Sequence, residues 1–131
     1  MTLLLDTQAL LWWREGSRRL GPRARAAIEE RAVAVFVSAA SGWEIAIKLR
    51  TGRLRLREPL EVWMPAALES SGFGVLPIAM RHAVAVAGLP DHHADPFDRL
   101  LIVQAQIEDL TIVTSDGAFN EYDVRLLDAR A

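Results

Sequence analysis

The sequence contains no cysteine, which excludes disulfide bonds, thiolate metal sites and cysteine nucleophiles together. No apolar run is long enough to cross a membrane. Asp6 interrupts the N-terminal leucine run too early for the apolar region of a signal peptide, and no positively charged flank precedes it. We therefore expect a cytoplasmic protein that has no membrane partner.

Lysine is almost absent, because Lys48 is the only one and arginine supplies the remaining positive charge. The net charge of −2 does not indicate nucleic-acid binding. Arginines cluster at 14–25 and 50–57, and their fork of donors suits phosphate groups. Solvated helix faces explain these clusters more simply, so charge alone assigns no partner.

The length of 131 residues and an apolar content of 51% predict a single domain, 1–131, with a substantial core. Apolar runs alternate with helical patterns along the chain, which is typical of an α/β fold. We expect a central, mostly parallel sheet of about five strands, covered by helices on both faces. The expected strands lie at 2–5, 34–37, 73–78, 111–114 and 123–127. The expected helices run from Thr7 to the break at Gly16, and at about 22–31, 39–50, 59–72 (with a kink or split at Pro65), 79–87 and 96–109.

Four acidic residues are predicted to meet at one edge of this sheet. Asp6 and Asp116 follow strand candidates. Asp98 lies in the first turn of a helix entered from the same edge, and Glu44 lies in the second turn of a helix that follows a strand. Parallel α/β sheets carry their functional sites beyond the carboxyl ends of the strands.

Each acid taken alone also has a structural explanation. Asp6 and Asp116 suit caps or turns, Asp95 is most simply the N-cap of the helix that carries Asp98, and Glu44 has Lys48 four residues on.

Taken as a set, the four acids indicate a metal site. Converging carboxylates repel one another and destabilise the fold, and a hard divalent cation removes that penalty. Oxygen ligands without thiolates suit Mg²⁺ or Mn²⁺ better than Zn²⁺. Such a centre is suited to hydrolysing phosphodiesters, because a metal lowers the pKa of a bound water and stabilises charge on phosphoryl oxygens.

Four motifs in order resemble those of PIN-domain ribonucleases, particularly the VapC-type toxins of bacterial and archaeal toxin–antitoxin pairs. The motifs are LLLDT at 3–7, SAASGWEIAIK at 38–48 followed by GRL at 52–54, LP at 89–90 with HHADPFDRLL at 92–101 and QA at 104–105, and TSD at 114–116 with Phe119 and Tyr122. The resemblance covers nearly the whole chain. Ala94 is a mild departure, since a basic residue often stands there in similar sequences.

The resemblance implies a three-layer PIN-like fold and a metal-dependent endoribonuclease that hydrolyses RNA. It assigns the metal-binding and catalytic acids as Asp6, Glu44, Asp98 and Asp116, with Mg²⁺ or Mn²⁺ as cofactor. It also implies a homodimer, or a larger toxin–antitoxin assembly, and a VapB-like antitoxin that masks the site. Residues expected to support the acids are Asp95, Ser38, Thr7, Thr114, Ser115 and Arg99.

Two other functions stay open at this point. A non-catalytic binding module with the same fold would act through a protein partner, but it has no need of four converging acids. A receiver-like or phosphatase-like domain also places aspartates at strand ends, but it needs a lysine near the site, and Lys48 shares a helical stripe with Glu44.

Two groups of residues near the motifs carry weaker predictions. His92 and His93 precede the Asp95 motif, and we interpret them as polar loop residues without a catalytic role. Trp43 is expected in the core. Trp12 and Trp13 are adjacent on one helix and cannot both face inward, so one of them is a candidate for a dimer or antitoxin surface.

Overall fold

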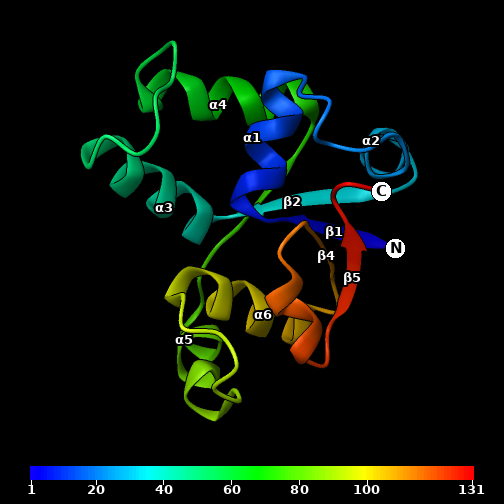
Figure 1. The fold of residues 1–131 in the computed structure, drawn as a ribbon, viewed down its shortest axis with the longest axis vertical. Helices are drawn as coiled ribbons and strands as arrows, with labels where there is room; N and C mark the ends of the chain where they lie inside the picture. The colour runs from blue at the N-terminus through cyan, green and yellow to red at the C-terminus, as the bar shows by residue number, and fades with distance from the viewer.

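The computed structural model describes residues 1–131 and contains one sheet of five strands (Figure 1). The strands are β1 (Thr2–Leu5), β2 (Ala34–Ser38), β3 (Gly74–Leu76), β4 (Thr111–Thr114) and β5 (Arg125–Asp128). Their order across the sheet is β3-β2-β1-β4-β5, and every neighbouring pair is parallel. The predicted α/β class is confirmed, and the sheet is wholly rather than mostly parallel.

Helices cover both faces of the sheet, as predicted. The α-helices are α1 (Thr7–Glu15), α2 (Pro22–Glu29), α3 (Ala39–Arg50), α4 (Leu60–Ser71), α5 (Met80–Ala85) and α6 (Pro96–Glu108). In Figure 1, α1, α3 and α4 lie on one side of the sheet, and α5 and α6 lie on the other. No helix is both long and apolar enough to cross a membrane.

Strand β1 shows why the sequence forms three layers. Leu3 and Leu5 belong to the core cluster that packs against α1, α2 and α4, whereas Leu4 belongs to the cluster beneath α6. Successive side chains of a strand point to opposite faces, so a central strand covered on both sides must be apolar throughout. The unbroken leucine run of β1 meets this requirement.

The remaining differences from the sequence predictions are local. Strand β3 is shorter than the predicted 73–78, and β5 begins two residues later than predicted. The helix predicted at 79–87 ends at Ala85 and continues as a 3₁₀ turn, Val86–Gly88. Helix α4 continues through Pro65, because Trp63 and Ala67 on either side of it are buried in the core.

The strand order places the carboxyl ends of β1 and β4 side by side at the middle of the sheet. From β1 the chain moves through β2 to the β3 edge, whereas β4 and β5 lie on the other side of β1. Ligands of open parallel sheets bind where the strand order reverses in this way. The backbone N–H of Asp6 donates to the carbonyl of Val113 at 3.1 Å, so the exits of the two strands are joined directly.

Candidate metal site

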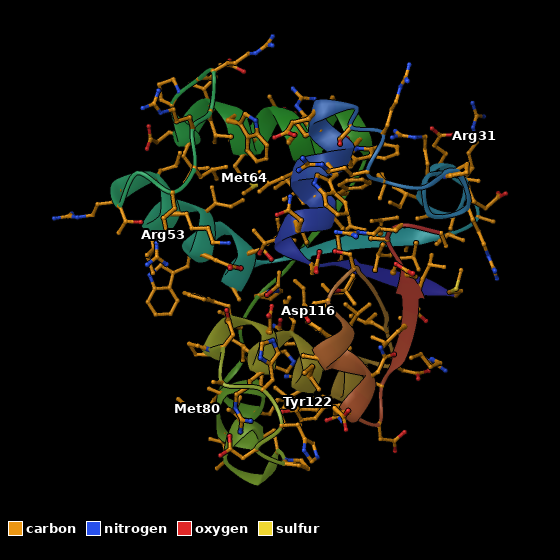
Figure 2. All side chains as sticks on the ribbon, viewed as in Figure 1. Arg31, Arg53, Met64, Met80, Asp116 and Tyr122 are labelled. Atoms are coloured by element: carbon orange, nitrogen blue, oxygen red, sulfur yellow. The ribbon has the colours of Figure 1, made fainter.

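The four acids predicted from the sequence line one cavity of about 180 Å³ that has no apolar lining residue. Asp6 follows β1, Asp116 follows β4, Glu44 lies on α3 and Asp98 lies on α6. Figure 2 shows Asp116 near the centre of the molecule, between α1 and α3 on one side and α6 on the other. The other residues that line the cavity are Thr7, Gln8, Lys48, Asp95 and Ser115.

Asp6 and Asp116 are helix caps as well as cavity residues. Oδ1 of Asp6 accepts a hydrogen bond of 2.7 Å from the N–H of Ala9 in the first turn of α1. Oδ1 of Asp116 accepts one of 2.9 Å from Ala118 in the 3₁₀ helix Gly117–Glu121. A cap of this kind uses one carboxylate oxygen and fixes the orientation of the group. Each of these two aspartates therefore caps a helix and also lines the cavity.

Glu44 is held from two sides. The hydroxyl of Thr7 donates to its Oε1 at 2.6 Å, and the ammonium of Lys48 lies 3.1 Å from its Oε2. The buried face of α3 includes the polar residues Ser41 and Glu44, so the polar stripe of this helix faces inward. The ion pair between Glu44 and Lys48 is present, but it lies at the wall of the cavity rather than on a solvated helix face.

Asp98 takes its position from Asp95. Oδ1 of Asp95 accepts hydrogen bonds from the N–H groups of Phe97 at 2.8 Å and Asp98 at 3.1 Å, and Pro96 occupies the first helical position. This is the predicted N-cap, and it places Asp98 in the first turn of α6 with its side chain at the cavity. Asp95 itself also lines the cavity, so two carboxylates approach it from α6.

Burial and mutual repulsion perturb two of the acids. The pKa of Asp98 is raised to about 7, chiefly by burial and next by the charge of Asp95, while His93 partly opposes the rise. Burial likewise raises the pKa of Asp6 to about 6, against hydrogen bonds from Thr114 and Ala9. The charge of Glu44 raises both pKa values, which shows that the acids share one electrostatic environment.

His93 belongs to the site, contrary to the interpretation of the sequence as a polar loop. Its Nε2 lies 2.8 Å from Oδ2 of Asp98 and 3.3 Å from Oδ2 of Asp116. The hydroxyl of Tyr122 accepts hydrogen bonds from the N–H groups of His92 and His93, and this contact fixes the loop. The only signal in the sequence was the proximity of His93 to the Asp95 motif, since a contact with Tyr122 leaves no local pattern.

The residues expected to support the acids divide into two groups. Thr7, Ser115 and Asp95 line the cavity, and Thr114 hydrogen bonds to Asp6. Ser38 and Arg99 lie elsewhere. Ser38 caps α3 and donates to Gln104 at 2.6 Å. The guanidinium of Arg99 donates to the carbonyls of Val86, Leu89, Pro90 and His93, so it supports the loop that carries His93 rather than a carboxylate of the site.

The tryptophans differ from expectation at one position. Trp12 is buried, and Trp13 is half-buried with its indole N–H donating to Ser71 at 2.9 Å. Trp43 was expected in the core, but 61% of it is exposed. The reason is the rotation of α3, whose inward face carries Ser41 and Glu44 and leaves Trp43 on the outward face.

The residues present fit a divalent cation. Ligand atoms of His93, Asp98 and Asp116 lie within 4.8 Å of one another, and Asp6 and Glu44 line the same cavity. The set is rich in carboxylate oxygen and contains no sulfur, which is the chemistry of hard cations. A bound cation would also relieve the repulsion that raises the pKa values of Asp6 and Asp98.

Comparisons with known proteins identify the family of this chain. The chain is 32% identical over 116 residues to Ribonuclease VapC22 of Mycobacterium tuberculosis, a match that covers 88% of this chain and 87% of that protein. Its fold is similar to a chain of VapBC2 from Rickettsia felis, solved with a promoter DNA fragment (TM-score 0.70, 12% identity, 97% of this chain and 98% of that one). It is also similar to a chain of FitAcB from Neisseria gonorrhoeae (TM-score 0.66, 22% identity, 97% of each chain). Residues 3–125 match the PIN domain. The chain thus belongs to the PIN-domain family and is of the VapC type.

Proposed function

We propose that this protein is a Mg²⁺- or Mn²⁺-dependent endoribonuclease, the toxin of a type II toxin–antitoxin pair. The observation that carries the proposal is the cavity in which Asp6, Glu44, Asp98 and Asp116 converge with two raised pKa values. The VapC-type relative is named a ribonuclease, which supports RNA as the substrate. A structural or purely adhesive role would not require a buried set of repelling carboxylates.

In this proposal each side chain has a defined task. Asp6, Glu44, Asp98 and Asp116 would hold the cation, and Thr7, Lys48 and His93 keep three of these acids in position through the contacts described above. The bound ion would supply an activated water and stabilise negative charge on the phosphoryl oxygens. Asp95 fixes the start of α6, and therefore the direction of Asp98, through the backbone.

The proposed partners follow from the neighbours in fold. The fold of this chain is similar to a chain of VapBC2, which supports a VapB-like antitoxin as its partner. We further propose a homodimer, or a larger toxin–antitoxin assembly, that acts in the cytoplasm. A masking antitoxin suits the site, because an open acidic cavity in an active nuclease requires control.

The test is cleavage of structured RNAs by the purified protein with Mg²⁺, with Mn²⁺ and with EDTA, compared with the variant Asp6→Asn. Asparagine retains the oxygen that caps Ala9 but removes the charge, so the fold should persist while cleavage falls at least about 100-fold. Asp123→Asn, a change at an exposed position outside the cavity, is the matched control and should cleave normally.

Two outcomes would contradict the proposal. Cleavage that persists in Asp6→Asn, or in EDTA, would exclude this mechanism. Failure of calorimetry to detect Mg²⁺ or Mn²⁺ binding near neutral pH, together with no cleavage of any RNA, would favour the alternative of a non-catalytic binding module.

A further inference from the structure

Trp43 is unlike the other three tryptophans of the protein. Trp12 and Trp63 are 4% and 6% exposed, whereas Trp43 is 61% exposed on the outward face of α3. Ile47, one helical turn further on, is exposed on the same face. A large aromatic ring left in water forgoes a favourable burial, so its position indicates a surface that makes contacts with a ligand.

The exposed ring lies next to the acid cavity. Trp43 directly precedes Glu44, and its contact partner Phe97 directly precedes Asp98. The rings of Trp43 and Phe97 are 5.2 Å apart between centroids and nearly perpendicular, at 82°. This edge-to-face pair joins the first half of α3 to the first turn of α6, the two helices that bring Glu44 and Asp98 to the cavity. It therefore forms a flank of the site.

The pair fixes the indole of Trp43 without covering it. In an edge-to-face contact, a ring presents either its edge or one of its faces to its partner. Trp43 consequently keeps at least one face free for stacking, in agreement with its high exposure. Packing against Phe97 limits the rotation of the indole, and a ring held in place loses little conformational freedom when a ligand stacks on it.

We propose that Trp43 is a stacking platform for an unpaired base of the RNA, at a nucleotide adjacent to the cleaved phosphodiester. This inference rests on the proposed function and adds that the cleaved segment is single-stranded. Bases stack on aromatic side chains in single-stranded RNA, whereas a double helix keeps their faces covered. A phosphodiester at the cavity carries its neighbouring bases to the flank where Trp43 lies.

The charge around the platform suits the same occupant. Lys48 lies at the cavity, and the exposed Arg50 and Arg53 follow it at the end of α3 and in the next loop. Cations beside an aromatic ring are the usual arrangement for a single strand, in which phosphates and bases alternate. Trp43, Ile47 and Phe97 form a small apolar patch that matches a base, whereas a stable protein interface buries about 800 Å² on each partner.

The experiment compares cleavage kinetics of the full chain with those of Trp43→Ala, Trp43→Phe and Val84→Ala. The substrate is a single-stranded oligoribonucleotide in which cleavage by the unaltered protein has been mapped. We expect Trp43→Ala to raise KM about tenfold with little change in kcat, Trp43→Phe to recover most of the loss, and Val84→Ala, an exposed change on α5, to have no effect. A duplex of the same sequence should be cleaved poorly by every variant.

An abasic nucleotide identifies the contact itself. The abasic nucleotide is placed in turn on each side of the cleaved bond. At one of these positions the unaltered protein should show the raised KM of Trp43→Ala. At that position the abasic substrate should not raise the KM of Trp43→Ala any further. An unchanged KM in Trp43→Ala, or additive losses at every position, would overturn the inference while cleavage by the unaltered protein still supports the proposed function. Absence of cleavage by the unaltered protein would contradict both. If Trp43→Ala cleaves RNA normally but no longer binds a co-expressed antitoxin, the ring belongs to a protein interface and the inference is wrong.

Discussion

The acids at the two ends of α6 have pKa values that are shifted in opposite directions. Glu108, near the C-terminal end, lies 2.9 Å and 3.2 Å from the guanidinium of Arg81, and this contact lowers its pKa. Asp98, in the first turn, has Asp95 and Glu44 as neighbours, and its pKa is raised to about 7. The fold therefore supplies a counter-charge for Glu108, whereas His93 only partly opposes the repulsion at Asp98 and a bound cation would complete the balance.

This contrast separates a structural ion pair from a site on one helix. An exposed pair such as that of Glu108 and Arg81 contributes little to stability and has no need of a ligand. A group of repelling carboxylates at a sheet edge costs stability, and it persists where function requires it. Three comparisons test this interpretation.

The largest difference is expected in catalysis. Asp98→Asn should lower kcat/KM for RNA cleavage at least about 100-fold, because it removes a charged ligand of the proposed cation, whereas Glu108→Gln on the same helix should retain full activity. The measurement is initial rates with saturating Mg²⁺ or Mn²⁺. Equal activities of the two variants would show that the acids at the two ends of α6 do not differ in function.

The next difference concerns stability and pH in the absence of metal. The pKa values of Asp6 and Asp98 are about 6 and about 7, against an ordinary value of 3.8, so the folded state binds these protons more tightly than the unfolded state. The stabilisation is complete below about pH 4 and is lost as the pH rises through 6 to 7. Between pH 5 and pH 8 the free energy of unfolding should fall, and Asp6 alone accounts for about 1–1.5 kcal/mol of this loss.

Thermal unfolding with EDTA at pH 5 and pH 8 measures this loss. Mg²⁺ should restore stability at pH 8 by balancing the ionised acids. Asp98→Asn should raise Tm at pH 8 without metal and weaken the response to Mg²⁺, whereas Glu108→Gln should leave both unchanged. A protein that is more stable at pH 8 than at pH 5 without metal would contradict the assignment of repulsion to the cavity.

The sequence predicted those parts of the molecule that depend on local pattern. The strand exits at Asp6 and Asp116 follow from apolar runs that end in a carboxylate, and the cap at Asp95 follows from the Asp-Pro pair. The positions of Glu44 and Asp98 early in helices next to that edge predicted that they join the same set, and the structure brings all four acids to one cavity.

The rest depends on contacts between distant segments, which no local pattern encodes. The position of His93 depends on Tyr122 and Arg99, which hold the 86–93 loop from other elements. The exposure of Trp43 depends on which face of α3 turns inward, and that face carries Glu44, bound by Thr7, together with the apolar Ala40 and Ile45. Glu44 is buried on this face, where the hydroxyl of Thr7, which follows the neighbouring strand β1, donates to it.

The smallest expected effect is on stability alone, and it concerns a buried, hydrogen-bonded polar residue in the middle of α6. Gln104 is completely buried, accepts a hydrogen bond from Ser38 at 2.6 Å and donates one to the carbonyl of Pro77 at 3.2 Å. Gln104→Leu would remove the acceptor of the buried Ser38 hydroxyl and the hydrogen bond to Pro77, at a cost of about 1–3 kcal/mol in the free energy of unfolding. Gln106→Leu, an exposed change two residues further on, is the matched control and should be nearly neutral.

Unlike the effect of Asp98→Asn, the loss of stability in Gln104→Leu should be the same at pH 5 and pH 8 and with or without Mg²⁺, as measured by denaturant unfolding. A loss that Mg²⁺ reverses would place Gln104 in the electrostatic network of the cavity, and the distinction between a paired core and an unbalanced site on α6 would no longer hold.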